Sequence, residues 1–300
     1  MRPLVLLCAV LLVCAFASAP SAAAPPASLS CHPDAAWTEP AAPLRIYGDT
    51  WFVGTCGLSS ILIASKQGHV LIDGDVPEAA PLIEANIRKL GFRVEDVRYI
   101  LNSHEHSDHA GGIAQLQRDS HAVVAARAPA AAALERGHGD RSDPQFLSGK
   151  SYPAVDKNAV RTIVDGEKIR LGAIELTAHA TPGHTPGSTS WTWNSCEKDR
   201  CLGIVYADSL SAISDDAFRY SDEAKHPGVV DAFRRSIATI AGLHCDILLT
   251  PHPDASDLWD RLGVGKTAPL IDAGGCRRYA ATASKNLDMR LTKERTGTTP

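Results

Sequence analysis

The sequence predicts an α/β protein in which two β-sheets pack face to face and helices cover their outer sides. Two observations carry this prediction. Runs rich in β-formers alternate with segments of helical periodicity, and the order of strands followed by a helix occurs once in each half of the chain. The 300 residues, of which 44% are hydrophobic and 21% charged, are also enough to bury a large core. We therefore expect an ordinary globular protein.

The first half begins with an arm rich in Ala, Pro and Ser, at residues 19–43, which we expect to be extended. Three β-rich runs separated by turn segments then predict antiparallel strands. Apolar residues at helical spacing from 76 to 90 predict a helix that ends at Gly91. The elements expected in this half are strands at 51–53, 59–64, 69–72, 97–101 and 121–126 and helices at 76–90, 112–117 and 126–134.

The second half repeats this alternation in outline, which suggests the second sheet. A run of short strands precedes a helix, a buried strand and a long terminal helix. The elements expected here are strands at 160–164, 168–171, 174–178, 188–193, 202–207 and 246–250 and helices at 229–241 and from about 268 to 290.

The charge balance argues against a nucleic acid partner. The chain has 30 Lys and Arg against 34 Asp and Glu, a formal net charge of −4, and no long basic run. Binding to a phosphate backbone requires an excess of positive charge on one face. We therefore do not expect a nucleic acid partner.

The first residues have the pattern of a secretory signal. Arg2 precedes an unbroken apolar run at 4–17, which is shorter than the roughly 20 residues that span a bilayer. Ala15-Phe16-Ala17 then offers a small-x-small cleavage pattern. We predict a signal peptide at 1–22, with an approximate cleavage point, and a single exported domain at 23–300, periplasmic or secreted and free of the membrane. A membrane anchor is the less favoured alternative.

Export changes the meaning of the eight cysteines, because exported proteins fold under oxidising conditions. Cys8 and Cys14 lie within the predicted signal, so an even six remain and predict disulfides. Six cysteines can pair in many ways, and only proximity in the sequence favours one set: Cys31 with Cys56, Cys196 with Cys201 and Cys245 with Cys276. Metal binding by some of these thiolates is the alternative, although no Cys-x-x-Cys occurs.

A histidine-rich segment at 102–112 carries the chemistry of the chain. His104 and His106 are two residues apart directly after a predicted buried strand, so in an extended segment they project to the same side. Asp108 and His109 follow as the chain bends and can reach a second ion beside the first. Imidazole and carboxylate without thiolate suit Zn²⁺. The segment therefore predicts a metal site; the alternative interpretation is a solvated polar loop.

Two further histidines follow predicted strands in rigid turns. His184 lies in Thr-Pro-Gly-His-Thr-Pro-Gly, and His252 lies between Pro251 and Pro253. Neighbouring prolines limit the backbone freedom of a residue and so preposition it as a ligand. Either histidine alone fits a surface turn, but with the first motif they complete two sites of three residues each.

Together these motifs resemble the metallo-β-lactamase superfamily, whose fold is a four-layered αβ/βα sandwich with a two-metal site along the sheet edges. Within it the chain resembles the third subclass of metallo-β-lactamases, and there the three-disulfide group typified by the Adelaide imipenemase. The resemblance covers nearly the whole predicted mature chain and is carried by residues 54–58, 103–111, 188–193, 206–216 and 246–253, with Asp73 as the acid that supports the metal loop.

This resemblance implies two Zn²⁺ per chain and a ligand set for each. His104, His106 and His184 are then the ligands of the first ion. Asp108, His109 and His252 are the ligands of the second. Each ion keeps an open coordination position, which distinguishes a catalytic site from a structural site closed by four protein ligands.

The implied activity is hydrolysis of the β-lactam amide of penicillins, cephalosporins and carbapenems by a zinc-bound hydroxide, which gives antibiotic resistance. Asp108 is the catalytic residue that orients this hydroxide. Ser209 and Ser211 are candidates to bind the substrate carboxylate, and Gln145 resembles a pocket-wall residue. For these three residues ordinary loop structure is the alternative interpretation.

Asp208 is where the chain departs from the pattern of the third subclass. Many hydrolases of the superfamily, such as thioesterases and lactonases, use an Asp here to bridge the metals. Because Ser209 follows, as in the third subclass, we place Asp208 behind the metal ligands and not on the metal. The competing hypotheses are a thioesterase or lactonase, an iron dioxygenase of the superfamily and a non-catalytic zinc-binding protein. We expect a monomer, since no heptad pattern occurs.

Overall fold

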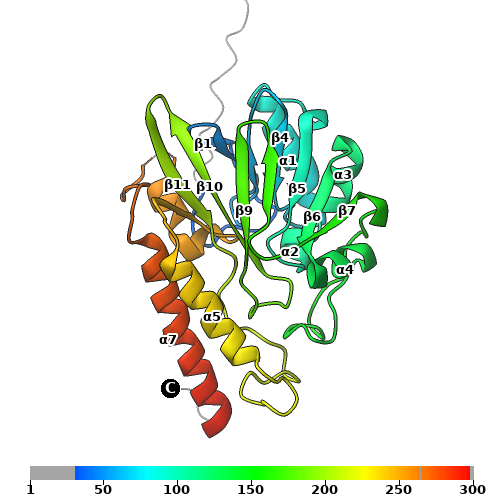
Figure 1. Cartoon of the computed structure of the whole chain (residues 1–300), viewed down its shortest axis with the longest axis vertical. Helices are drawn as coiled ribbons and strands as arrows, with labels where there is room; N and C mark the ends of the chain where they lie inside the picture. The colour runs from blue at the N-terminus through cyan, green and yellow to red at the C-terminus, as the bar shows by residue number, and fades with distance from the viewer. Residues whose placement is uncertain (1–30, 264, 298–300) are drawn as a thin grey trace, which may run out of the picture.

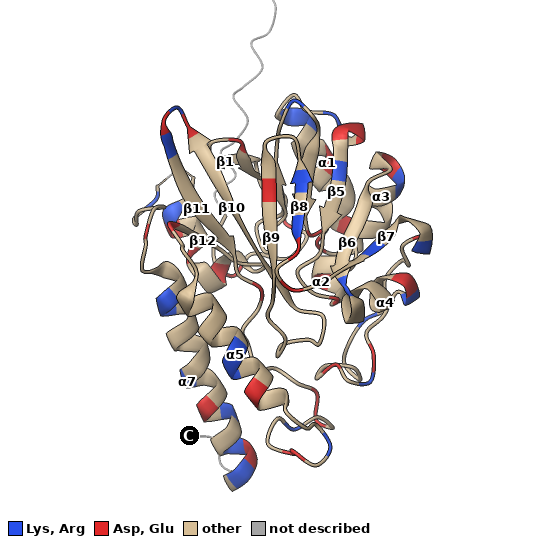
Figure 2. Ribbon diagram, viewed as in Figure 1, with Lys and Arg blue, Asp and Glu red and all other residues tan. Residues whose placement is uncertain are grey.

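The computed structural model describes residues 31–263 and 265–297 and consists of two facing sheets with helices on both outer sides (Figure 1). The predicted signal at 1–22 lies outside the described residues. The predicted αβ/βα sandwich is confirmed. Among the described residues, the structure contains no helix with the length and apolar character needed to cross a membrane. Lys and Arg are interspersed with Asp and Glu along the described ribbon (Figure 2).

The first sheet has the strand order β1-β2-β3-β4-β5-β6-β7. Neighbours are antiparallel from β1 to β4, as the turn segments predict, and parallel from β4 to β7. Parallel neighbours require long crossover connections. The helices α1 (Ala80–Lys89), α3 (Ile113–Ser120) and α4 (Ala128–Arg136) provide them. The strands are β1 Leu44–Tyr47, β2 Thr50–Phe52, β3 Ile61–Ile63, β4 His69–Ile72, β5 Val97–Leu101, β6 Val123–Arg127 and β7 Val160–Ile163.

The second sheet has the order β12-β11-β10-β9-β8. Its strands from β8 to β11 are antiparallel neighbours, whereas β12 follows the helix α5 (Val229–Gly242) and pairs in parallel with β11. The strands are β8 Lys168–Leu171, β9 Ile174–Ala180, β10 Thr189–Glu197, β11 Arg200–Tyr206 and β12 Ile247–Leu249.

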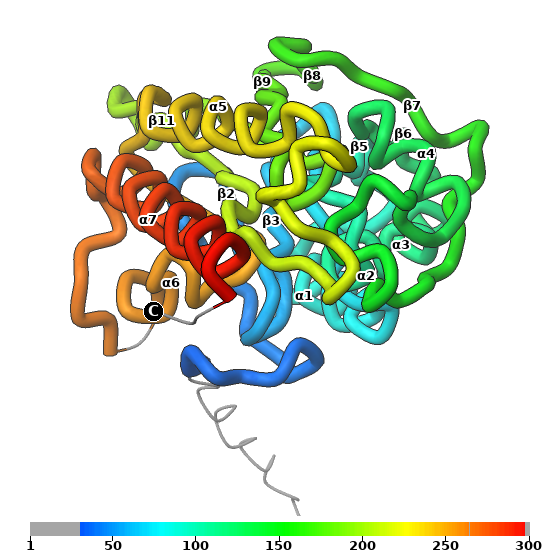
Figure 3. Tube along the Cα trace, turned by 90° about the horizontal axis from the view of Figure 1, so that it is seen from below, coloured from blue at the N-terminus to red at the C-terminus, as the bar shows by residue number. Residues whose placement is uncertain are grey.

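The helices form the two outer layers, and Figure 3 shows α5 and α7 side by side on one of them. The helices of the first sheet are α1 Ala80–Lys89, α2 Ser107–Ala110, α3 Ile113–Ser120 and α4 Ala128–Arg136. Those of the second half are α5 Val229–Gly242, α6 Leu258–Arg261 and α7 Gly275–Thr296. Short 3-10 turns lie at η1 Pro77–Ala79, η2 Val94–Asp96, η3 Lys157–Ala159 and η4 Pro253–Ser256.

One core fills the space between the sheets, and two more lie beneath the helical layers. The central core includes Phe52 and Ile72 from the first sheet and Trp191 and Ile247 from the second. Burial of such side chains typically stabilises a fold by about 1.5–3 kcal/mol each. This core holds the two sheets face to face. The histidine motifs follow the strands β5, β9 and β12 at the ends of these sheets.

One predicted strand is present but lies in the other sheet, and one predicted helix has the wrong bounds. The strand predicted at 160–164 belongs to the first sheet, because it pairs in parallel with β6. The terminal helix begins at Gly275 and ends at Thr296, later than the predicted 268–290. The backbone N–H groups at 267 and 268 donate to the carbonyl of Asp260, and the Asp272 carboxylate accepts the Gly274 N–H, so this segment forms turns before the helix starts.

The three disulfides favoured by sequence proximity are confirmed. Each fixes a different part of the fold: the first ties the N-terminal arm to the turn after β2, the second closes the β10–β11 hairpin, and the third joins the approach to β12 to α7. The pairs are Cys31–Cys56, Cys196–Cys201 and Cys245–Cys276.

Candidate metal centre

The histidine-rich segment leaves the sheet edge at the end of β5, and Asp73 holds it there. Asp73 follows the neighbouring strand β4 and is fully buried. Its carboxylate accepts the Ser103 N–H at 2.7 Å, the Ser103 hydroxyl at 2.6 Å and the Tyr206 hydroxyl at 2.8 Å. Three donors on one carboxylate fix the loop that begins at Ser103, which is the role predicted for this acid.

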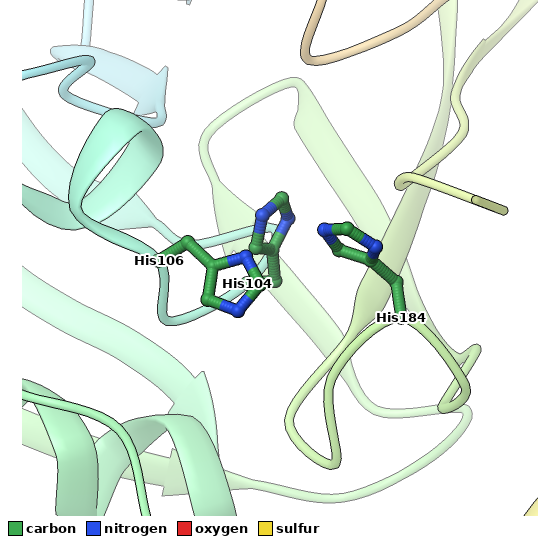
Figure 4. Close-up of side chains that lie close together, drawn as sticks. All are labelled: His104, His106 and His184. Carbon is green, nitrogen blue, oxygen red and sulfur yellow. The ribbon is translucent and has the colours of Figure 1, made fainter. Parts of the chain in front are cut away.

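Three imidazoles from two loops face one another at this edge (Figure 4). One ring nitrogen from each of His104, His106 and His184 lies within 4.8 Å of the others. His104 and His184 are buried, and Nε2 of His104 has no hydrogen-bond partner among the described residues. A buried polar atom without a partner is costly unless it meets a ligand.

A hydrogen bond behind each imidazole fixes which nitrogen faces this group. The Nδ1 atom of His104 lies 2.7 Å from an Asp208 carboxylate oxygen, and His184 Nδ1 donates to the Ser211 carbonyl at 2.9 Å. His106 uses its other nitrogen, Nε2, which lies 3.0 Å from Asp143. Such outer partners set ring orientation and tautomer at metal sites.

The second predicted group is more compact still. The Oδ2 atom of Asp108 lies 3.1 Å from Nε2 of His109 and 3.2 Å from Nε2 of His252, and the two imidazole nitrogens are 3.2 Å apart. Tetrahedral zinc, with bonds of about 2.0–2.1 Å, places neighbouring ligand atoms about 3.3 Å apart. The donors therefore fit a zinc ion, and His104 lies close enough to Asp108 and His109 that the two groups adjoin.

The protein environment holds the donors of both groups in contrasting charge states. Burial and the neighbouring histidines lower the pKa of His104 and of His184 well below the usual value. Burial opposes the charge of His109, but Asp108 outweighs it and raises the pKa of His109 to about 9. The His109 imidazole in turn holds the pKa of Asp108 well below its usual range despite burial. Neutral imidazoles and an ionised carboxylate are the forms that bind metal, so His104, His184 and Asp108 are already in these forms, whereas His109 must release a proton when metal binds.

Comparison with known proteins identifies the family. The family model of the metallo-beta-lactamase superfamily matches residues 53–197. The solved structure of Rm3 metallo-beta-lactamase is 49% identical, with a TM-score of 0.83, over 87% of this chain and 97% of that one. This chain belongs to the metallo-β-lactamase superfamily. MEM-A1, a subclass B3 metallo-beta-lactamase from a soil metagenome library, is 45% identical over 88% of this chain and all of its own, with a TM-score of 0.83. The resemblance to the third subclass is confirmed.

A curated relative from another branch of the superfamily matches only part of the chain. The hydroxyacylglutathione hydrolase of Rhodopseudomonas palustris (strain HaA2) is 32% identical over 46% of this chain. The match spans 42% of that enzyme's length. The likeness is therefore confined to part of each protein, whereas the metallo-β-lactamase structures match along almost their whole length.

The two donor groups of this metallo-β-lactamase fold open into one cavity of about 900 Å³. All three predicted substrate-binding residues, Ser209, Ser211 and Gln145, line it. The Ser211 hydroxyl lies 3.0 Å from Nδ1 of His184. Trp37, from the arm held by the first disulfide, also lines the cavity, with its ring 5.9 Å from that of His252.

Asp208 lies beside the His104 imidazole, on the side of the ring that faces away from the other two histidines. It is fully buried, and one carboxylate oxygen contacts the imidazole nitrogen of His104 that faces away from the group. Its other oxygen, Oδ2, has no partner among the described residues. Burial raises the pKa of Asp208, opposed by His184 and other neighbours.

Two acidic residues at the site are missing from the sequence prediction. Asp143, which contacts His106, lies 37 residues away in a loop without helical or strand periodicity, so no pattern indicates it. Glu105 lies inside the motif, where alternation places its side chain opposite to the neighbouring histidines. Its carboxylate contacts Thr185 and Gly187 instead. Only the tertiary structure brings these partners together.

Proposed function

We propose that this protein is a di-zinc β-lactamase of the third subclass. The observation that carries the proposal is the pair of adjoining three-residue donor groups that open into one cavity. A purely structural zinc site is closed by four protein ligands, whereas three leave a position for water or substrate. The first ion would be held by His104, His106 and His184, and the second by Asp108, His109 and His252.

When bound, zinc lowers the pKa of water and polarises a substrate carbonyl. The chain's own residues would supply orientation. We assign to Asp108 a second task beside metal binding: it accepts a hydrogen bond from the attacking water and so directs it at the β-lactam carbonyl carbon. The Ser209 and Ser211 hydroxyls on the cavity wall would donate to the carboxylate of the substrate, and Gln145 would close the opposite wall.

The proposal includes export. The apolar segment at 4–17, the small residues after it and three disulfides together support a periplasmic or secreted protein. We expect the mature chain to be a monomer that meets its substrate outside the cytoplasm, where it would confer resistance to penicillins, cephalosporins and carbapenems.

A thioesterase is the second candidate, because the matched relative is a hydroxyacylglutathione hydrolase. In that branch we expect the residue at Asp208 to bridge two metals. Here one oxygen of Asp208 contacts Nδ1 of His104 at 2.7 Å, the position of a supporting residue. The contact favours β-lactam hydrolysis over thioester hydrolysis.

The test is a hydrolysis panel with purified mature protein and added zinc. The substrates are a penicillin, a cephalosporin, a carbapenem and a glutathione thioester, each assayed with and without a chelator. We expect β-lactam turnover that the chelator abolishes and zinc restores. His104→Ala should lose it, whereas the control His244→Ala, at a side chain that is 79% exposed, should keep it. Thioester turnover without β-lactam turnover would overturn the proposal in favour of the second candidate.

A further inference from the structure

Glu105 links the two loops that supply the first donor group. It lies between His104 and His106 and is only 3% exposed. Its Oε2 accepts the Thr185 hydroxyl at 2.7 Å, and its Oε1 accepts the Gly187 N–H at 3.0 Å. Both oxygens therefore bind the turn that carries His184, about 80 residues further along the chain.

Arg127 binds the same turn through its carbonyls. This half-buried residue ends β6, and its guanidinium donates to the Ser188 carbonyl at 2.9 Å and to the Pro186 carbonyl at 3.3 Å. Glu105 thus accepts hydrogen bonds from an N–H and an O–H group of the turn, and Arg127 donates hydrogen bonds to two of its carbonyls. Charged partners make such hydrogen bonds stronger than neutral ones.

We propose that Glu105 and Arg127 form a clamp that positions His184 against His104 and His106 for metal binding. The Ser211 carbonyl oxygen accepts a hydrogen bond from Nδ1 of His184 at 2.9 Å and so fixes the rotation of the ring. This contact does not fix the backbone that carries the ring. The clamp holds that backbone. Because Glu105 is flanked by two ligands and contacts the residue after the third, it joins all three in one rigid unit.

The packing around Gly187 leaves the clamp no room to shift. A Cβ atom at Gly187 would lie 2.3 Å from Oε2 of Glu105 and 2.7 Å from the backbone nitrogen of Ala130. Within the turn, Thr185 also contacts Ser188, with 3.0 Å between their hydroxyl oxygens. A carboxylate set so closely against a turn transmits a displacement of one loop to the other.

The clamp predicts which substitution of Glu105 preserves the geometry of the turn. In Glu105→Gln the amide oxygen accepts the Gly187 N–H, and the amide N–H donates to the Thr185 oxygen, whose own proton turns to Ser188. This variant should keep the geometry. Glu105→Ala leaves a buried N–H without its partner and frees the turn. The inference rests on the proposed metal site but not on β-lactam turnover.

The experiment measures stepwise zinc binding by competition with a chromophoric chelator, together with the visible spectrum of the Co²⁺-substituted protein. Glu105→Ala should weaken the first zinc ion, the one that His184 would hold, about tenfold and alter the Co²⁺ spectrum of that site, as loss of an outer partner does at other sites. Glu105→Gln should match the wild type in both. The control Glu135→Ala, at an exposed position on α4, should change neither.

Urea unfolding of the metal-free variants separates positioning from general stabilisation. If Glu105→Ala lowers only the apo stability and binds both ions normally, the clamp is refuted. It is equally refuted if Glu105→Gln behaves like Glu105→Ala. Should Glu105→Ala fail to fold, Thr185→Val removes the hydroxyl that donates to Glu105 and contacts Ser188, and it must still weaken the first ion. If the Glu105 variants change zinc affinity as predicted but the wild-type chain does not hydrolyse β-lactams, the proposed function is overturned and the clamp is not.

Discussion

Removing the Asp143 carboxylate should weaken the first zinc ion selectively. Asp143 is 3% exposed, and its two oxygens lie 3.0 and 3.1 Å from Nε2 of His106. Burial opposes a charge on His106, but Asp143 outweighs this and raises its pKa. The carboxylate thus increases the electron density that the imidazole offers through its other nitrogen.

The expected size follows from the burial of this contact. A hydrogen bond to a charged group contributes about 1.5–3 kcal/mol, and about 1.4 kcal/mol corresponds to a tenfold change in affinity. Asp143→Ala should therefore weaken the first ion by roughly ten- to a hundredfold. Asp143→Asn keeps an acceptor without the charge and should lose less.

Zinc titration against a competing chelator gives the two constants separately. The second ion is the internal control, since Asp108, His109 and His252 make their contacts with one another and form no hydrogen bond or ion pair with Asp143 in the described structure. The reasoning is refuted if Asp143→Ala binds the first ion as tightly as the wild type, or if both ions weaken equally. The variant should also raise KM, because the same carboxylate accepts the N–H of Gln145 on the cavity wall.

Three further predictions concern the second ion, the loop support and the disulfides. Asp108→Ala should lose the second zinc and most of kcat, and unchanged metal content and rate would contradict its role. Asp73→Asn should lower the free energy of unfolding in urea by about 2–3 kcal/mol, since its amide faces buried donors; an unchanged urea midpoint would refute this. Replacing Cys245 and Cys276 by Ser opens a loop with a sequence separation of 31 and should cost about 3–4 kcal/mol by chain entropy. Equal stability of this variant and the oxidised protein would contradict the estimate.

Local patterns predict most of the fold because hydrophobic periodicity reflects burial. The strands His69–Ile72 and Val97–Leu101 are rich in apolar residues, and both are predicted from the sequence with these bounds. The strand Val160–Ile163 shows the limit of such patterns. Its sequence indicates a strand but not which strand it pairs with. The crossover through α4 and the loop after it bring it beside β6. Helix α7 starts late because contacts of Asp260 and Asp272 hold the preceding segment in turns.

The site divides in the same way. Metal-binding side chains sit in short motifs with fixed spacing, so all six candidate ligands are visible in the sequence. Their outer partners are chosen by tertiary proximity: Asp143 and Ser211 meet histidines that are 37 and 27 residues away. Asp143 has no motif of its own, and the sequence predicts Ser211 only as a contact of the substrate. The sequence therefore indicates the chemistry of the site and two of its supports, Asp73 and Asp208. Only the structure gives the contacts that Asp143 and the Ser211 carbonyl make with the histidines.

The central claim is that two adjoining zinc sites in this fold hydrolyse β-lactams. The most direct measurement determines metal content per chain and carbapenem hydrolysis on the same purified sample, before and after chelation and after zinc is returned. We predict two zinc ions per chain, loss of both metal and turnover on chelation, and recovery of both with zinc. A fully zinc-loaded chain that leaves the carbapenem intact, or turnover that survives complete removal of the metal, would contradict the account.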